Sequence, residues 1–234
     1  MMKYLFLNTP FQILSWYFFV LLGMVVGIGL AVIKRPEKDF PVTRGGIFAC
    51  GLLMFCLAIL GSKNLYILLY WDSFSVEEGL SWTRMFADAG YASLGAFSFY
   101  LLGIFIFTKF RVRRISFLKV ADYAIPFTVL AQAFTKIGCF FAGCCYGKPT
   151  KLPWGVICPG ETEVPVHPTQ IYSSIYLLVV FFFMRSLYKK TPPPGITFFS
   201  GMLLYSVLRF LNESLRVDSV SLNDKITLSQ GAIP

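Results

Sequence analysis

The residues best suited to chemistry in this sequence form a short ladder, RFLNESLR, over residues 209–216. Arg209, Glu213 and Arg216 are spaced i, i+4 and i+7, so a helix would place them on one face. They follow an apolar stretch, in which ionisable side chains are costly to bury and are candidates for function. Two guanidiniums that flank a carboxylate suit a phosphate, with the carboxylate orienting them. The alternative is a structural ladder that ties helices together, with Arg216 reaching the membrane interface.

A second group lies in the stretch 136–170, KIGCFFAGCCYGKPTKLPWGVICPGETEVPVHPTQ. Lys136 lies in the outer half of an apolar run and either serves a site or extends its ammonium to the interface. His167, the only histidine, is the one side chain that titrates near neutral pH without perturbation, so it is either a general base or a rigid loop contact between prolines. Asp122 begins the apolar run that contains Lys136, and its simplest role is a helix cap or an ion-pair partner.

Three cysteines, Cys139, Cys144 and Cys145, lie within seven residues of that stretch. Thiolates are soft ligands for zinc or iron–sulfur centres. The spacing CxxxxCC differs from the usual CxxC, however, and we expect adjacent cysteines on a turn to point apart. The sequence therefore favours a disulfide or a packing role, and we predict no metal site and no cofactor. A thiol or metal protein built on these residues and Cys158 remains a third functional hypothesis.

Membrane-spanning helices must position these residues. Of the 234 residues, 56% are hydrophobic and only 14% are charged, against about 25% charged in soluble domains. A span needs roughly 20 apolar residues, and the first stretch is too long for a signal-peptide core. The predicted fold is an all-α, polytopic integral membrane protein, with a single transmembrane domain over residues 1–234. Its six predicted spans cover about 12–33, 45–61, 90–107, 121–143, 170–184 and 195–215.

The distribution of basic residues predicts how these spans are oriented. A formal net charge of +9 would suggest nucleic acid as the partner of a soluble chain, but here Lys and Arg cluster after the first, third and fifth spans. By the positive-inside rule, the loops at 34–44, 109–119 and 185–191 are cytoplasmic and both termini lie outside. The 136–170 stretch and the end of the last span then share the outer face. We expect a membrane and no nucleic acid as partner.

Several motifs, taken in order, resemble those of the bacterial prolipoprotein diacylglyceryl transferases. Trp16–Tyr17 resembles the family's WYG-like start, and IGCFFAGCCYG over 137–147 resembles its glycine-rich GRxGNFxNxExxG box. VHPTQIY over 166–172 resembles HPSQLYE, and RFLNESLR resembles RFxxExxR. The last two motifs are the most specific because they keep order, spacing and chemistry. The resemblance covers nearly the whole chain.

The resemblance implies an enzyme of the bacterial inner membrane with its active site toward the outer face. Such a transferase moves the diacylglyceryl group of phosphatidylglycerol onto the lipobox cysteine thiol of a preprolipoprotein and releases glycerol phosphate. We therefore expect phosphatidylglycerol or a related phospholipid and a lipobox-containing preprolipoprotein as partners, or, for a close relative of these enzymes, another acceptor. The predicted catalytic residues are Arg209, Glu213, Arg216 and His167. The residues predicted to bind the substrate are Tyr17, Asp122, Lys136, Gly138, Gly147 and Tyr172.

The sequence departs from the family motifs at several polar positions. Lysine stands at 136 in place of the signature arginine, cysteine at 139 and 144 in place of the box asparagine and glutamate, serine at 173 in place of the glutamate after HPSQLY, and leucine at 94 where the family's HGG turn would fall. The family's seventh helix is expected to be missing after ITLSQGAIP. Because phosphate-binding cations are kept while acid–base groups are changed, the alternative function is a non-catalytic phospholipid-binding membrane protein that retains the transferase fold.

Overall fold

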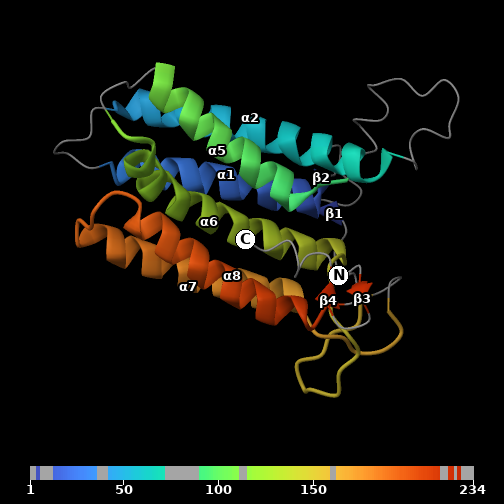
Figure 1. The fold of residues 1–234 in the computed structure, drawn as a ribbon. Coiled ribbons are helices and arrows are strands. Elements are labelled where there is room, and N and C mark those ends of the chain that lie inside the picture. Colours follow the sequence, from blue (N-terminus) through green and yellow to red (C-terminus); the bar gives the residue numbers. More distant parts are fainter. Residues whose placement is uncertain are drawn as a thin grey trace, which may run out of the picture. The chain divides into compact units, whose positions relative to one another are not determined.

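The computed structural model describes residues 4–5, 13–35, 42–71, 90–110, 115–158, 162–216, 221–223 and 226–227. Within these ranges the fold is all-α, as predicted, with two very short antiparallel hairpins as its only strands, β1 with β2 and β3 with β4. The strands are Tyr4–Leu5 (β1), Ile13–Leu14 (β2), Ser221–Asn223 (β3) and Ile226–Thr227 (β4). The six helices (Figure 1) are α1 Ser15–Ile33, α2 Arg44–Leu69, α5 Ser93–Phe110, α6 Phe117–Ala142, α7 Thr169–Lys189 and α8 Ile196–Glu213.

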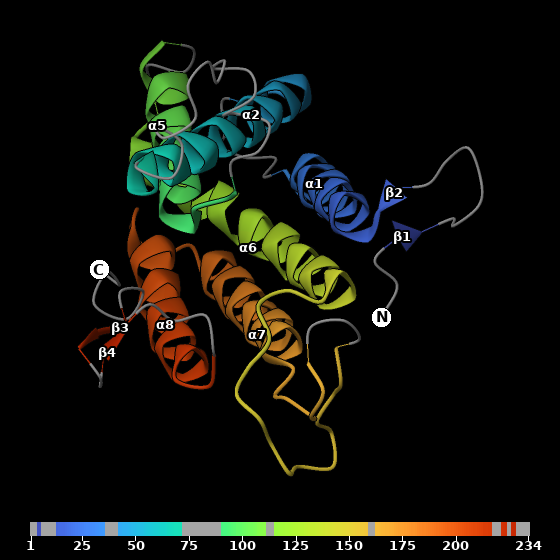
Figure 2. The same ribbon diagram turned by 90° about the vertical axis from the view of Figure 1, so that its right-hand side faces the viewer.

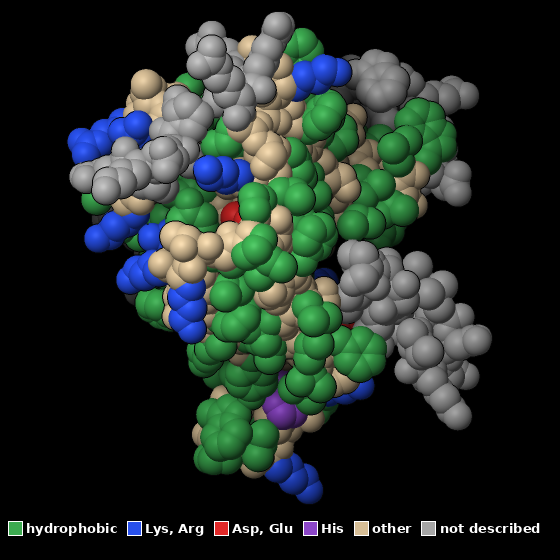
Figure 3. Space-filling model, turned by 60° about the vertical axis from the view of Figure 1, so that its left-hand side comes forward, with side chains coloured by type: hydrophobic (Ala, Val, Ile, Leu, Met, Phe, Trp, Pro, Cys, Tyr) green, Lys and Arg blue, Asp and Glu red, His purple; other side chains and the backbone are tan. Residues whose placement is uncertain are grey.

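Five of these helices, α1, α2, α5, α6 and α7, are long and apolar enough to cross a membrane. Figure 3 shows the consequence, because hydrophobic side chains cover much of the visible face. The sixth helix, α8, forms where it was predicted but is less apolar, since Arg209, Asn212 and Glu213 fall inside it. The polytopic membrane fold is thus confirmed. Four basic residues used to orient the spans lie outside the described residues: Lys38, Arg111, Arg113 and Arg114.

The helices form two compact units, which are described separately. The second unit, residues 28–121, contains α2 and α5, which lie side by side (Figures 1 and 2). Gly61 and Gly95 meet at this interface, where a Cβ on Gly61 would lie 2.5 Å from the Gly95 carbonyl oxygen. Small residues let membrane helices approach this closely. The prediction of a single domain over residues 1–234 stays a prediction.

The first unit, residues 1–27 and 122–234, holds every predicted site residue. In it, α1 lies directly on α6: a Cβ on Gly23 would lie 2.5 Å from the Ala131 carbonyl oxygen, and one on Gly27 2.9 Å from the Phe127 carbonyl oxygen. Helices α7 and α8 are neighbours (Figure 2). They are joined by the predicted tight stop TPPPG, in which Gly195 precedes α8 with a φ of 97° that favours glycine.

Asp122 fastens α6 to the start of α8. Its two carboxylate oxygens accept the backbone N–H groups of Gly195 at 2.6 Å and Phe198 at 2.7 Å, and the side chain is buried. A carboxylate at a helix N-terminus also meets the positive end of the helix dipole. Asp122 lies about 21 Å along α6 from Lys136, at 1.5 Å per residue. Asp122 therefore has the capping role that was the simplest expectation for it, and substrate binding by this residue stays a prediction.

An Asp122→Ala variant is expected to lower the free energy of unfolding by about 2–4 kcal/mol, because it leaves two buried N–H groups without an acceptor. Asp122→Asn, which keeps one acceptor oxygen, is expected to lose about half as much. Thermal unfolding in detergent micelles measures both. Wild-type stability of the alanine variant would contradict the capping role.

Candidate functional site

Glu213 holds the two arginines of the ladder, as its spacing predicted. One carboxylate oxygen lies 3.5 Å from Nη2 of Arg209 and 3.6 Å from Nη1 of Arg216. The glutamate is only 3% exposed, and the arginine side chains are 16% and 15% exposed. Arg209 also donates a hydrogen bond to the hydroxyl of Tyr205, four residues before it. The result is a largely buried Arg–Glu–Arg group at the C-terminal end of α8.

Lys136 joins this group from α6. Its ammonium lies close enough to Arg209 and Arg216 to interact with both electrostatically. We call Lys136, Arg209, Glu213 and Arg216 the charged cluster. It joins α6 to the C-terminal end of α8, and Lys136 and Arg209 are more than 70 residues apart in sequence. Like charges are costly to hold together at low dielectric. Three cations in a cluster that holds a single carboxylate therefore favour an anion as ligand.

The loop after α6 is tied to the end of α8 by backbone hydrogen bonds. Gly147 forms a bridge with Arg216, and the Lys148 N–H donates to the Leu215 carbonyl at 2.8 Å. The Lys148 ammonium donates to the Ser214 carbonyl at 2.9 Å. A Cβ on Gly147 would lie 2.6 Å from the Leu215 carbonyl oxygen, so this close approach needs glycine. Gly147 thus brings the 136–170 stretch and the ladder together.

The start of α7 supports the same loop with buried polar side chains that were not predicted. Thr169 Oγ1 donates to the Cys145 carbonyl and Gln170 Nε2 to the Cys144 carbonyl, each at 2.6 Å. Asn212, one residue before Glu213, donates to Ser173 Oγ at 2.9 Å. The first two residues belong to the quoted HPTQ motif, so their polarity at the entrance of a span was the available signal. Tyr205 was detectable by its spacing of four from Arg209.

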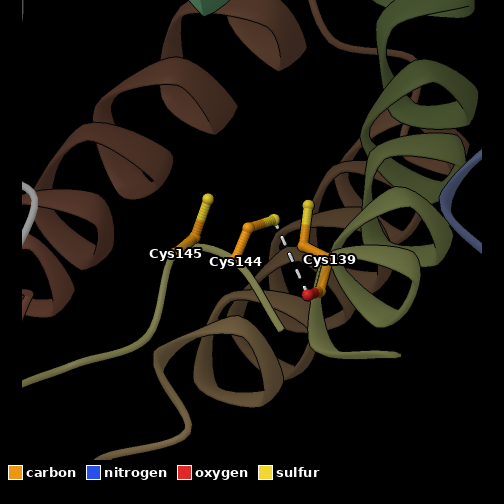
Figure 4. Close-up of side chains that lie close together, drawn as sticks. All are labelled: Cys139, Cys144 and Cys145. Atoms are coloured by element: carbon orange, nitrogen blue, oxygen red, sulfur yellow. Dashed lines mark hydrogen bonds between the residues drawn. The ribbon is translucent and has the colours of Figure 1, made fainter. Parts of the chain in front are cut away.

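The three thiols of Cys139, Cys144 and Cys145, which we call the thiol cluster, converge. Their sulfur atoms all lie within 4.8 Å of one another, and Figure 4 shows the side chains turned toward the same side. The expectation that adjacent cysteines point apart was wrong. Cys145 adopts a left-handed φ of 63°, two residues after Gly143 at 76°, and this turn brings the loop thiols back to Cys139 on α6.

Hydrogen bonding sets the protonation of the two loop thiols. Hydrogen bonds from the thiols of Cys139 and Cys144, aided by the charges of Lys136 and Arg216, lower the pKa of Cys145 in spite of its burial. The pKa of Cys144 is raised because its thiol hydrogen-bonds Cys139 and Cys145 and is partly buried. Hydrogen bonding within the cluster thus shifts the pKa values of its two loop thiols in opposite directions.

A family model described as prolipoprotein diacylglyceryl transferase matches residues 3–232. The chain belongs to the prolipoprotein diacylglyceryl transferase family. A phosphatidylglycerol–prolipoprotein diacylglyceryl transferase of Clostridium tetani is 32% identical over 84% of this chain and 80% of its own length. A second such transferase from Clostridium perfringens is 32% identical over 88% and 80%, and one from Thermosynechococcus vestitus is 29% identical over 92% and 82%.

The other residues predicted from the transferase motifs lie around the loop after α6 and along α1, and the His167 carbonyl accepts the Gly147 N–H at 2.9 Å. His167 Nδ1 lies 3.3 Å from the Tyr172 hydroxyl, which also accepts a 2.8 Å hydrogen bond from Trp154 Nε1. Gly138 packs against Phe19 and Trp16 on α1, where a Cβ would lie 2.9 Å from Phe19 Cβ. Tyr17 is 47% exposed. Catalysis by His167 and substrate binding by Tyr17, Gly138, Gly147 and Tyr172 stay predictions.

Proposed function

We propose that this chain is a phosphatidylglycerol-dependent diacylglyceryl transferase that acts on the lipobox cysteine of preprolipoproteins. The observation that carries the proposal is the charged cluster, in which Lys136 meets Arg209, Glu213 and Arg216 in a chain of the transferase family. The relatives named above are transferases that use phosphatidylglycerol and prolipoprotein. The curated relatives support the reaction, and the cluster supplies a place for the lipid phosphate.

The reaction places new charge where these cations lie. A phosphodiester carries one negative charge. The bond that breaks joins a carbon of the diacylglyceryl group to a phosphate oxygen. When it breaks, the departing glycerol phosphate gains a second negative charge. Positioned cations stabilise this developing charge more than they stabilise the substrate, and such differential stabilisation lowers the barrier. Arg209 and Arg216 offer planar guanidiniums for the phosphate oxygens, while Lys136 acts as a point charge.

We place the enzyme in the bacterial inner membrane with this site toward the outer face. The charged cluster lies at the C-terminal ends of α6 and α8. The N-terminal ends of the same two helices meet at Asp122 and Gly195. Lys189 and Lys190 end α7 just before that opposite end. The positive-inside rule puts basic residues on the cytoplasmic side. The orientation of the membrane spans explains the basic loops, so we propose no nucleic acid as a partner.

Diacylglyceryl transfer is tested with the purified full chain in detergent, phosphatidylglycerol and a synthetic lipobox peptide. Mass spectrometry is expected to show the peptide gaining one diacylglyceryl group in thioether linkage, with release of glycerol phosphate. A peptide with serine in place of the lipobox cysteine should stay unmodified, because the serine hydroxyl is a far weaker nucleophile than a thiolate. An unmodified cysteine peptide together with co-purified phospholipid would refute the transferase and favour the non-catalytic lipid-binding alternative.

A further inference from the structure

We propose that the thiol cluster of Cys139, Cys144 and Cys145 binds a zinc ion whose fourth coordination position takes the acceptor thiol. The first half of this inference concerns metal binding alone, and the second half rests on the proposed function. Neither half follows from the sequence analysis, which predicted no metal site because the spacing is unusual. The convergence of the three sulfur atoms in Figure 4 is what points to the metal.

The separation of the thiols fits a zinc ion after small side-chain rotations. A zinc–sulfur bond of about 2.3 Å in tetrahedral geometry places sulfur atoms about 3.8 Å apart. The three sulfur atoms of the cluster lie within 4.8 Å of one another without a metal. The loop that carries Cys144 and Cys145 is fixed by hydrogen bonds from Gln170 and Thr169 to the two cysteine carbonyls. The backbone of the site is therefore already in place.

The composition of the cluster is that of an open zinc site. Structural zinc has four protein ligands, whereas catalytic zinc has three and keeps a position for water or substrate. Among the described residues, no other cysteine, histidine or carboxylate joins the group. Cys158 is buried elsewhere in the loop and does not belong to the group. Three thiolates without a fourth protein ligand leave one position for an incoming sulfur.

The surrounding charges compensate such a site. Zinc with three thiolates carries one negative charge, and a fourth thiolate raises this to two. Lys136 and Arg216 both interact electrostatically with Cys145. The same cations belong to the charged cluster, so the metal-bound sulfur and the lipid phosphate would be held by one group of side chains. This arrangement would bring the two reactants together.

The chemical step then needs no redox partner. The acceptor thiol binds zinc and loses its proton to water, since a coordinating thiol is deprotonated. Its sulfur electron pair forms a bond to the carbon that links the diacylglyceryl group of phosphatidylglycerol to the phosphate. The bond from that carbon to the phosphate oxygen breaks, and glycerol phosphate leaves with the electron pair. The neutral thioether is a weaker ligand and dissociates, while zinc stays divalent. Cysteine at 139 and 144, where the family has asparagine and glutamate, would thus supply thiol activation.

Metal content tests the first half directly. The full chain, purified under reducing conditions in detergent and equilibrated with equimolar zinc, is expected to retain one zinc ion per chain by elemental mass spectrometry. Cys144→Ser and Cys139→Ser should each weaken zinc binding by at least about tenfold. Cys56→Ser is the matched control, because Cys56 is exposed and lies outside the cluster. Thermal unfolding of each variant identifies any that fail to fold, and the wild-type measurement stands without them.

Cobalt substitution tests the open position. Cobalt in the wild-type site is expected to give sulfur-to-metal charge-transfer absorption, which increases when the lipobox peptide is added and is unchanged by the serine peptide. A wild-type chain that retains no zinc, or that forms a disulfide within the cluster, would overturn the inference. Zinc binding without thioether formation would refute the proposed function and leave the metal site standing. Thioether formation by the metal-free chain would support the proposed function and overturn the role of zinc in activating the acceptor thiol.

Discussion

Replacing Arg209 with alanine is expected to lower the rate of diacylglyceryl transfer by about 10²- to 10³-fold, the usual cost of removing one group that stabilises developing negative charge. Arg209 lies inside α8, pairs with Glu213 and interacts with Lys136, so its charge acts in largely buried surroundings. Electrostatic interactions are stronger there than in water. The measurement is the initial rate of thioether formation with phosphatidylglycerol and the lipobox peptide.

Two further variants separate charge from geometry. Arg209→Lys keeps the charge but loses the planar pair of donors, so we expect it to recover only part of the rate. Lys189→Ala removes an exposed cation at the end of α7, away from the charged cluster, and should leave the rate within about twofold of wild type. Full activity of Arg209→Ala would sink the assignment of the charged cluster as the phosphate site.

The second large effect is expected on stability. Glu213→Ala should lower the free energy of unfolding by about 3–5 kcal/mol, because removing one partner of a buried ion pair leaves uncompensated charge. Glu213 is 3% exposed and faces both Arg209 and Arg216. Without its carboxylate, the repulsion between Lys136 and the two arginines is no longer offset by a negative charge within the charged cluster. Unfolding in detergent, followed by circular dichroism, measures this loss.

A matched control is available in the loop before α7. Glu163 is exposed, and Glu163→Ala is expected to change stability by less than about 0.5 kcal/mol. Added phosphate should restore part of the stability of the Glu213→Ala variant, since an anion can replace the missing carboxylate. If Glu213→Ala is as stable as wild type in the absence of any anion, the glutamate does not hold the arginines.

The sequence was sufficient for the helices and for the ladder, because both depend on local patterns. Hydropathy located the spans to within a few residues, except that α2 continues to Leu69 where the predicted span ended near residue 61. The i, i+4, i+7 spacing predicted that Glu213 would face Arg209 and Arg216, because helical geometry alone brings these positions together.

Contacts between distant segments were not available from the sequence. Asp122 caps a helix that begins more than 70 residues later, and the sequence around neither segment predicts this contact. The thiol cluster depends on one backbone torsion at Cys145, a residue type that seldom adopts a left-handed φ. The order of the spans did predict that the loop and the ladder share one face of the membrane, but not that Gly147 and Lys148 would join them through backbone bonds.

The close packing of α1 on α6 also bears on how a lipid reaches the enzyme. Three glycines, Gly23, Gly27 and Gly138, let the two helices touch at successive levels, with less than 3 Å between each missing Cβ and its neighbour. An acyl chain needs full van der Waals spacing on both sides, so this seam is sealed against hydrocarbon. If Lys136 binds the lipid phosphate as proposed, a two-tailed substrate diffusing in the bilayer must enter by a route other than this seam.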